Sequence, residues 1–121
     1  MNNMKINLIR SFIPGKDVNV SKQFYLDIGF KIIWEDEDLI EFGTTQQNFF
    51  LQKHYQEDWA NNTMIQMFVD DLDSLYNIAE KVIQNYKGTK IKSIFSAHYG
   101  RTFHLVDPSG VLWHMCEKLK K

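Results

Sequence analysis

The segment 103–113 reads FHLVDPSGVLW and places two β-rich runs on either side of a strong turn signal. Residues 101–106 and 111–117 are rich in aromatic and aliphatic side chains, and Asp-Pro-Ser-Gly at 107–110 is a typical turn sequence. We therefore expect an antiparallel hairpin. Because side chains alternate along a strand, Trp113 and His114 should point to opposite faces, with Trp113 packed beneath a helix.

Upstream of the hairpin, the pattern changes from strand to helix and back. Residues 64–69 form a β-rich run, and the acidic residues of 70–73 are suited to cap a helix. Apolar residues then follow at helical spacing up to Gly88, namely Leu72, Leu75, Ile78, Ala79, Val82, Ile83 and Tyr86. With a further strand at 91–95, the second half of the chain reads β-α-β-β-β.

The first half has the same predicted order. Residues 4–13 alternate as a strand, Asp17 or Asn19 can cap a helix that ends at Gly29, and strands follow at 30–35, 39–42 and 48–55. Residues 56–62 connect the halves. The fold class is therefore α+β in a single domain, 1–121, with units at about 4–55 and 63–117. We expect two curved mixed sheets around a cavity, with the helices on the outer faces.

Composition excludes several classes of partner. A net charge of −1, from 14 basic and 15 acidic residues, gives no basic face for nucleic acid. No run approaches the roughly 18 apolar residues of a membrane span, so we expect no membrane association. The single cysteine, Cys116, cannot form a disulfide within the chain, which favours a cytoplasmic location.

Several motifs resemble those of the vicinal oxygen chelate superfamily (glyoxalase, bleomycin resistance, dioxygenase). FYLDIGF at 24–30 is similar to its FYxxLGF segment, VDDLD at 69–73 to the start of its second helix, and 103–113 to its closing hairpin FxLxDPxGxxW. With NFFLQ at 48–52 and WANN at 59–62, the resemblance extends to the bleomycin-resistance-like branch. It implies the two-unit fold and a homodimer, but it leaves activity open because the superfamily includes both enzymes and metal-free drug-binding proteins.

The metal-ligand positions implied by this resemblance fall on Arg10, Gln52, Met64 and His114. Only His114 is a good ligand for a divalent metal ion. A guanidinium group keeps its proton at any usable pH and has no lone pair to donate. We therefore expect no metal and no other cofactor.

Strand alternation predicts which side chains line the cavity and bind a small-molecule ligand. They are Arg10, Phe12, Trp34, Phe50, Gln52, Met64, Gln66, Phe68, Thr102, His104 and His114. Arg10 either clamps an acidic group of the ligand or pairs internally with Glu41 or another carboxylate. His104 and His114 are candidate donors or proton carriers, or hydrogen-bonded interior histidines, and Met64 is core or pocket filler.

Three functions are consistent with these residues. The first is a metal-free small-molecule-binding protein that sequesters an antibiotic or a small organic acid. Bleomycin itself is disfavoured, because a cationic ligand suits an acidic groove and this chain is near neutral, with Arg10 in the expected cavity. The second is a lyase, isomerase or transferase-type enzyme that uses His104 and His114 as acid and base, or an unusual metal site. The third is a dimerisation module whose cavity is filled by its own side chains.

Overall fold

The computed structural model describes residues 4–44 and 46–117, which form two units of the predicted order. The first unit contains β1 (Ser11–Pro14), α1 (Val18–Ile28), β2 (Ile32–Glu35), β3 (Leu39–Gly43) and β4 (Asn48–Gln52). The second contains β5 (Met64–Val69), α3 (Leu72–Val82), β6 (Lys90–Ala97), β7 (Gly100–Val106) and β8 (Leu112–Glu117), with a short 3-10 turn (Ile83–Asn85) after α3. A helix that was not predicted, α2 (Glu57–Asn62), forms most of the connector.

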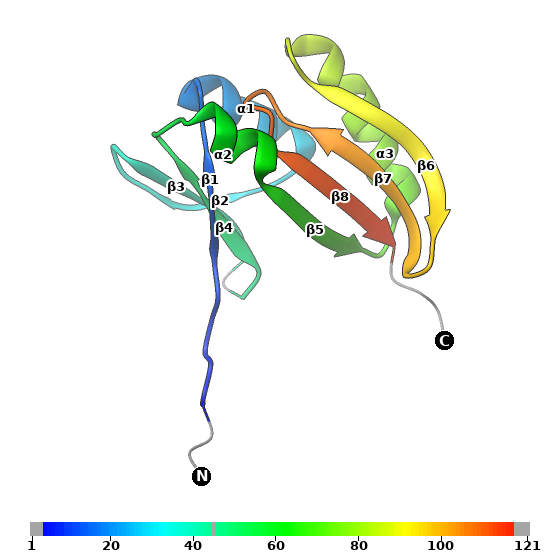
Figure 1. The fold of residues 1–121 in the computed structure, drawn as a ribbon, viewed down its shortest axis with the longest axis horizontal. Coiled ribbons are helices and arrows are strands. Elements are labelled where there is room, and N and C mark those ends of the chain that lie inside the picture. Colours follow the sequence, from blue (N-terminus) through cyan, green and yellow to red (C-terminus); the bar gives the residue numbers. More distant parts are fainter. Residues whose placement is uncertain (1–3, 45, 118–121) are drawn as a thin grey trace.

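Each unit forms a four-stranded mixed sheet with the same topology. The strand orders are β1-β4-β3-β2 and β5-β8-β7-β6, and the sheets lie side by side (Figure 1). β1 pairs with β4 and β5 with β8 in parallel, and the other pairs are antiparallel. The predicted α+β class and the duplicated β-α-β-β-β architecture are confirmed.

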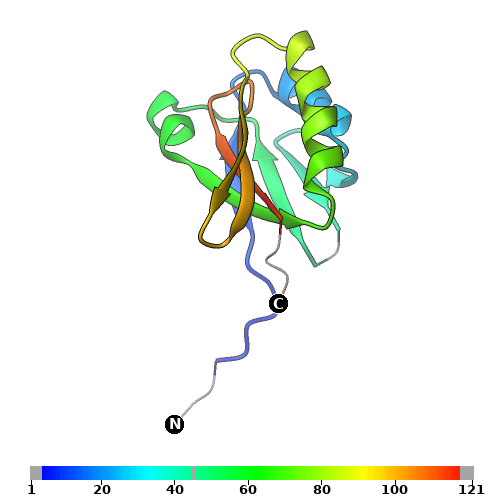
Figure 2. The same ribbon diagram turned by 90° about the vertical axis from the view of Figure 1, so that its right-hand side faces the viewer.

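Both units contribute to one core. Helices α1 and α3 lie together on the same side of the molecule, each against one face of the sheets (Figure 2). Trp113 is 1% exposed, as predicted, and its ring centroid lies 5.7 Å from that of Tyr25 and 5.0 Å from that of Phe49. The inner faces of both sheets pack into this shared core, and among the described residues no helix packs on the opposite face of either sheet, where Phe12 and Phe68 are exposed.

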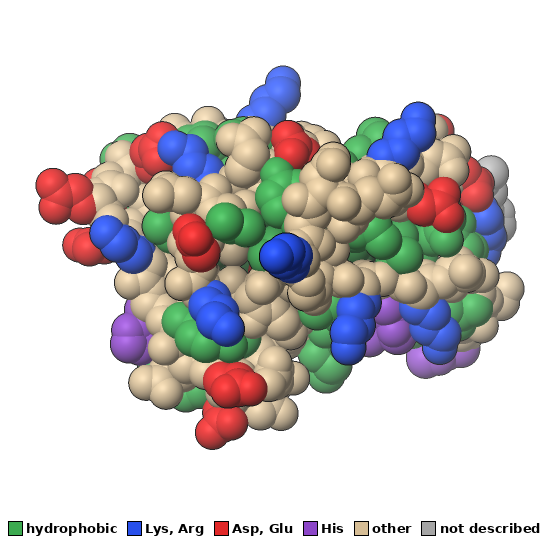
Figure 3. Space-filling model, turned by 90° about the horizontal axis from the view of Figure 1, so that it is seen from above, with side chains coloured by type: hydrophobic (Ala, Val, Ile, Leu, Met, Phe, Trp, Pro, Cys, Tyr) green, Lys and Arg blue, Asp and Glu red, His purple; other side chains and the backbone are tan. Residues whose placement is uncertain are grey.

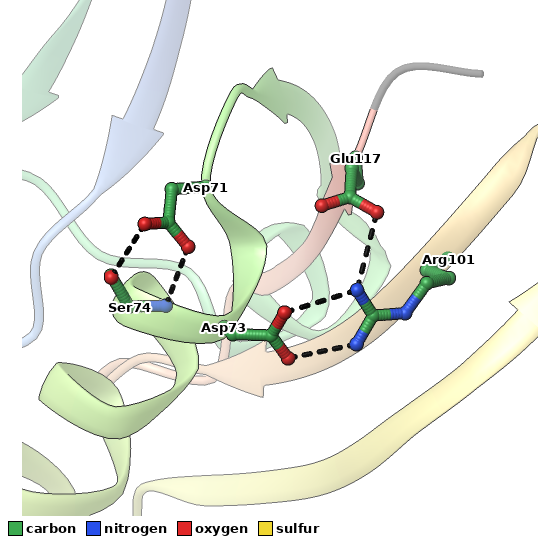
Figure 4. A network of polar contacts seen from close by, with 5 residues as sticks. All are labelled: Asp71, Asp73, Ser74, Arg101 and Glu117. Carbon is green, nitrogen blue, oxygen red and sulfur yellow. Dashed lines mark hydrogen bonds and ion pairs between the residues drawn. The ribbon is translucent and has the colours of Figure 1, made fainter. Parts of the chain in front are cut away.

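The start of α3 is tied to the end of the second sheet by charged side chains (Figure 4). Asp71 caps the helix, accepting hydrogen bonds from the backbone and hydroxyl of Ser74, and these bonds lower its pKa. Arg101 on β7 donates to Asp73 at 2.8 Å and to Glu117 on β8 at 3.2 Å. The predicted acidic cap is therefore present at Asp71.

The strand predicted at 4–13 is wrong for most of its length. Residues 4–10 adopt no regular secondary structure and are exposed, and they extend away from the sheets (Figure 1). The physical reason is the lack of a neighbour: β4 starts at Asn48, and its next residue, Phe49, already pairs with Ser11. A strand needs a partner for its backbone hydrogen bonds, which alternation alone does not reveal.

The surface carries side chains of both charges (Figure 3). Basic and acidic side chains are interspersed on the face drawn in Figure 3, in keeping with the near-zero net charge. Among the described residues, no helix is both long and apolar enough to span a membrane.

Candidate functional site: two rows on uncovered sheet faces

The uncovered face of the first sheet carries a row of four side chains, one from each strand. Phe12 on β1 is in register with Phe50 on β4, which faces Glu41 on β3, which faces Trp34 on β2. The rings of Phe12 and Phe50 are stacked, with centroids 4.8 Å apart and planes 22° apart. Phe12 is 51% exposed and Trp34 is 47% exposed. We call these four residues the aromatic row.

Arg10 lies against this row and is ion-paired within the chain. Its Nη2 is 3.6 Å from Oε2 of Glu41, and its guanidinium carbon is 5.1 Å from the centroid of the Phe50 ring. Of the two interpretations of Arg10, the internal ion pair is therefore present. The paired carboxylate belongs to a residue that is only 8% exposed and offsets the charge of Arg10, so the surface beside the aromatic row is mainly apolar.

A hollow of about 570 Å³ adjoins one end of the aromatic row. It is lined by Phe12, Asp38, Leu39, Gln52, Lys53, His54 and Trp59. The ring centroids of His54 and Trp59 are 5.4 Å apart, and Trp59, on α2, is 55% exposed. Trp59 was not among the predicted site residues, because the connector was not expected to form a helix that presents a side chain to the sheet edge. His54 was not predicted either, because it was expected to be an exposed residue near the end of a strand.

The uncovered face of the second sheet carries the corresponding row. Gln66 on β5 is in register with His114 on β8, which faces His104 on β7, which faces Lys92 on β6. We call these four residues the histidine row. The two imidazole centroids are 4.4 Å apart, with planes at 72°. Burial lowers the pKa of His104, and nearby His114 and Lys92 lower it further, so this imidazole is neutral at pH 7.

Side chains around the histidine row are mainly apolar. Met64 is 65% exposed and Phe68 is 46% exposed, so of the two interpretations of Met64, core or pocket filler, the core is wrong. The rings of Phe95 and His104 meet edge to face, with centroids 5.2 Å apart. Nζ of Lys92 is 4.5 Å from the centroid of the Phe95 ring. Thr102 is 0% exposed and its hydroxyl donates to the Met115 carbonyl, so a ligand cannot reach it.

Lys92 and Phe95 were absent from the predicted site, because no side chain of the strand predicted at 91–95 was assigned to the cavity. The pairing of β6 with β7 shifts register between these two residues. Simple alternation places residues three apart on opposite faces, whereas the bulge turns both side chains to the uncovered face. The alternation of side chains along the strand does not predict this bulge.

The eleven predicted site residues fall into two groups. Arg10, Phe12, Trp34, Phe50 and Gln52 belong to the first sheet or the arm before it, and the other six belong to the second sheet. Among the residues that the structure describes, no hydrogen bond, ion pair or ring contact joins the two groups. The described chain thus carries the two groups on separate sheets.

The metal-ligand positions do not fit a divalent ion. Arg10 and Gln52 lie on one side of this division and Met64 and His114 on the other, and only His114 offers a strong donor. Within 4–44 and 46–117, no three His, Cys, Asp or Glu residues are grouped so that they could hold a metal ion. Neither imidazole of the histidine row contacts a carboxylate in the described chain, so the orienting partner typical of acid and base histidines is not provided there.

Several solved structures share this fold. The bleomycin-binding protein of bleomycin-producing Streptomyces verticillus, complexed with copper(II)-bleomycin, matches with a TM-score of 0.78 and 19% identity over 97% of this chain and 100% of that chain. The chain has the bleomycin-binding-protein fold. A bleomycin resistance determinant encoded on transposon Tn5 matches this fold with a TM-score of 0.78 and 20% identity, over 95% of this chain and 100% of that chain.

The same fold also includes an enzyme. A lactoylglutathione lyase from Agrobacterium tumefaciens matches with a TM-score of 0.68 and 13% identity, over 91% of this chain and 92% of that chain. No protein-family model matches the sequence. No curated protein matches it significantly. The predicted resemblance is thus confirmed for the bleomycin-binding-protein fold, and the choice between binding and catalysis depends on the residues of the two rows.

Proposed function

We propose that this chain is a small-molecule-binding protein that holds a planar, apolar ligand against the aromatic row without coordinating a metal. The observation that carries the proposal is the exposure of Phe12 and Trp34 on a sheet face that no helix of the described residues covers. Large rings left in water on one flat face are typical of a binding surface. The adjoining hollow beside Trp59 provides room for a ligand larger than the row itself.

The chemistry of the row favours a ligand of defined shape. A flat ring can stack on Phe12, which is itself supported by Phe50 from below. Arg10 lies over Phe50 and is neutralised by Glu41, so this surface offers stacking more than charge recognition. Antibiotics with planar ring systems and aromatic organic acids both meet these requirements. Proteins of the same fold bind bleomycin, which supports an antibiotic as ligand.

We infer that the functional unit is a homodimer. Met4, Ile6 and Ile9, on the arm at 4–10, are 83%, 61% and 78% exposed. Three exposed apolar side chains on a segment without a strand partner favour burial against another chain. A second copy would cover the arm and could bring its histidine row opposite the aromatic row, which would complete a site from two half-sites. In the described chain Cys116 is a buried free thiol, which agrees with the proposed cytoplasmic location.

The test is a thermal-shift screen of planar aromatic antibiotics and aromatic acids, followed by titration of each hit. Phe12→Ala removes the stacking ring and should weaken binding about tenfold, since a ring pair contributes about 1 kcal/mol beyond area burial. Ile78→Ala is the matched control, because Ile78 is 44% exposed on α3, away from both rows. Equal affinity of the two variants for every hit would exclude the aromatic row as the binding surface.

An acid and base enzyme is the second candidate, and the contact between His104 and His114 is the observation that favours it. A neutral His104 can accept a proton from a bound substrate at pH 7. Each ligand found by the screen should therefore be incubated with the protein and analysed for new products. Conversion that stops in a His104→Gln variant, with binding retained, would establish catalysis.

A further inference from the structure

The histidine row includes one cation, Lys92, that no carboxylate of the described chain neutralises. Lys92 is close enough to His104 to lower its pKa, and His114 does the same. Among the described residues, neither these two imidazoles nor the Lys92 ammonium group forms an ion pair with a carboxylate. Arg101 on the neighbouring part of β7 differs, because Asp73 and Glu117 neutralise it.

The rest of this sheet face has no acidic side chain either. By register, the uncovered face also carries Met64, Phe68, Lys90, Phe95, Thr102, Val106, Leu112 and Cys116. Within the described strands the face therefore has two lysines, two histidines and no carboxylate. At the lower right edge of Figure 3, histidine side chains adjoin basic and hydrophobic ones. In the first sheet, the position equivalent to His104 is occupied by Glu41, which pairs with Arg10.

We infer that the histidine row is an oxyanion-binding subsite, which takes the carboxylate or phosphate group of an aromatic ligand through Lys92, His104 and His114. This inference rests on the proposed binding function and adds that the ligand is an acid. Gln66 completes the row with an amide group that can donate a further hydrogen bond. The role of recognising an acidic group, expected for Arg10 from the sequence, is thereby assigned to the other sheet.

The apolar neighbours define the remainder of the ligand. Phe68 and Phe95 flank the row and present ring surface to the same side as the imidazoles. Charge-assisted hydrogen bonds are strengthened when apolar groups exclude water around them. A small inorganic anion would leave these rings exposed, whereas an aryl carboxylate or aryl phosphate would cover them.

The test uses naphthoate, naphthyl phosphate and the neutral amide naphthamide as probes, each titrated into the full chain and followed by NMR. Naphthoate or naphthyl phosphate should bind about tenfold more tightly than naphthamide, and the one that binds better identifies the acid class. Lys92→Met should remove most of this preference. Lys81→Met makes the same charge change at an exposed position in the last turn of α3 and should leave the preference intact.

Three results would overturn the inference. They are an absence of saturable binding by both acids, equal affinity for acid and amide, and an equal effect of the two lysine variants. A His104→Gln, His114→Gln double variant should lose much of the preference for acid over amide and keep the fold. If Phe12→Ala weakens the ligands found by the screen while Lys92→Met does not, the proposed function stands and the oxyanion subsite is wrong.

Discussion

The hydroxyl group of Tyr25 on α1 donates a hydrogen bond to the buried carboxylate of Asp107, 82 residues later in the chain, at 2.5 Å. The same hydroxyl accepts a bond from the indole of Trp113 at 2.9 Å. A second bond runs in the opposite direction, because Tyr86 of the second unit donates to Asp27 of the first. Each unit thus contributes a tyrosine to an acid of the other, which helps to hold the two sheets in one body.

Replacing Tyr25 by Phe should lower the free energy of unfolding by about 1–3 kcal/mol, since Asp107 and Trp113 each lose a partner in a buried site. Urea denaturation followed by fluorescence measures this change. Tyr76→Phe is the control, because the Tyr76 hydroxyl makes only a long, exposed contact with Glu80 at 3.5 Å. Its effect should stay within about 0.5 kcal/mol, and equal losses in the two variants would argue against a stabilising role for the Tyr25 bond.

Stability should fall in alkali. Burial, followed by the bond to Asp27, raises the pKa of Tyr86 to about 12, and burial raises the pKa of Tyr25 well above 10. The folded chain therefore keeps these protons where the unfolded chain loses them. The stabilising contribution is complete below about pH 10 and is lost as the pH rises through the folded pKa.

Urea denaturation between about pH 9 and about pH 12 measures this slope. Tyr86→Phe removes one of the two groups and should make the decline shallower. A decline of unchanged steepness in the variant would show that Tyr86 does not contribute to it.

Two glycines provide a matched test of backbone packing. Gly29 has φ of 124° with no atom within 4 Å of an added Cβ, whereas Gly43 has φ of 122° with the Gln47 carbonyl oxygen 2.2 Å from it. Gly29→Ala should cost about 1–2 kcal/mol from backbone strain alone. Gly43→Ala should cost at least about 2 kcal/mol more, because the turn must also move. Urea denaturation of both variants would disprove this if the losses were equal.

The exposed arm predicts the assembly state. Replacing Ile6 and Ile9 together by Asp should convert a dimer into a monomer, because charged side chains cannot be buried in an apolar contact. Light scattering during gel filtration measures the mass. Ile78→Asp, on α3, should leave the dimer intact. A wild-type chain that is already monomeric would refute the proposed homodimer.

The order of elements and much of the core followed from local patterns. Asp17 and Asp71 cap the two long helices at positions that the sequence indicated, and Gly29 ends the first helix at positive φ. Trp113 was expected to be buried because its neighbour His114 had to take the opposite face. These features depend on residues close together in the sequence, so periodicity and capping chemistry could predict them.

The site was predicted less completely. The bulge in β6 brings Lys92 and Phe95 to one face, and α2 presents Trp59 beside the aromatic row. Neither follows from strict alternation or from the composition of the connector. Met64 was interpreted as core or pocket filler, and it is not core. An apolar residue on a sheet face is buried only if another element covers that face.

The amino-acid sequence determined the duplicated β-α-β-β-β order, the helix caps and the face of each strand that packs inward, because local backbone preferences and hydrophobic periodicity set these features. Only the tertiary structure decided that Arg10 is paired with Glu41, that residues 4–10 lack a strand partner, and that the aromatic and histidine rows lie on separate sheets. These relationships join residues distant in the chain, and their formation depends on how the two sheets pack rather than on any local pattern.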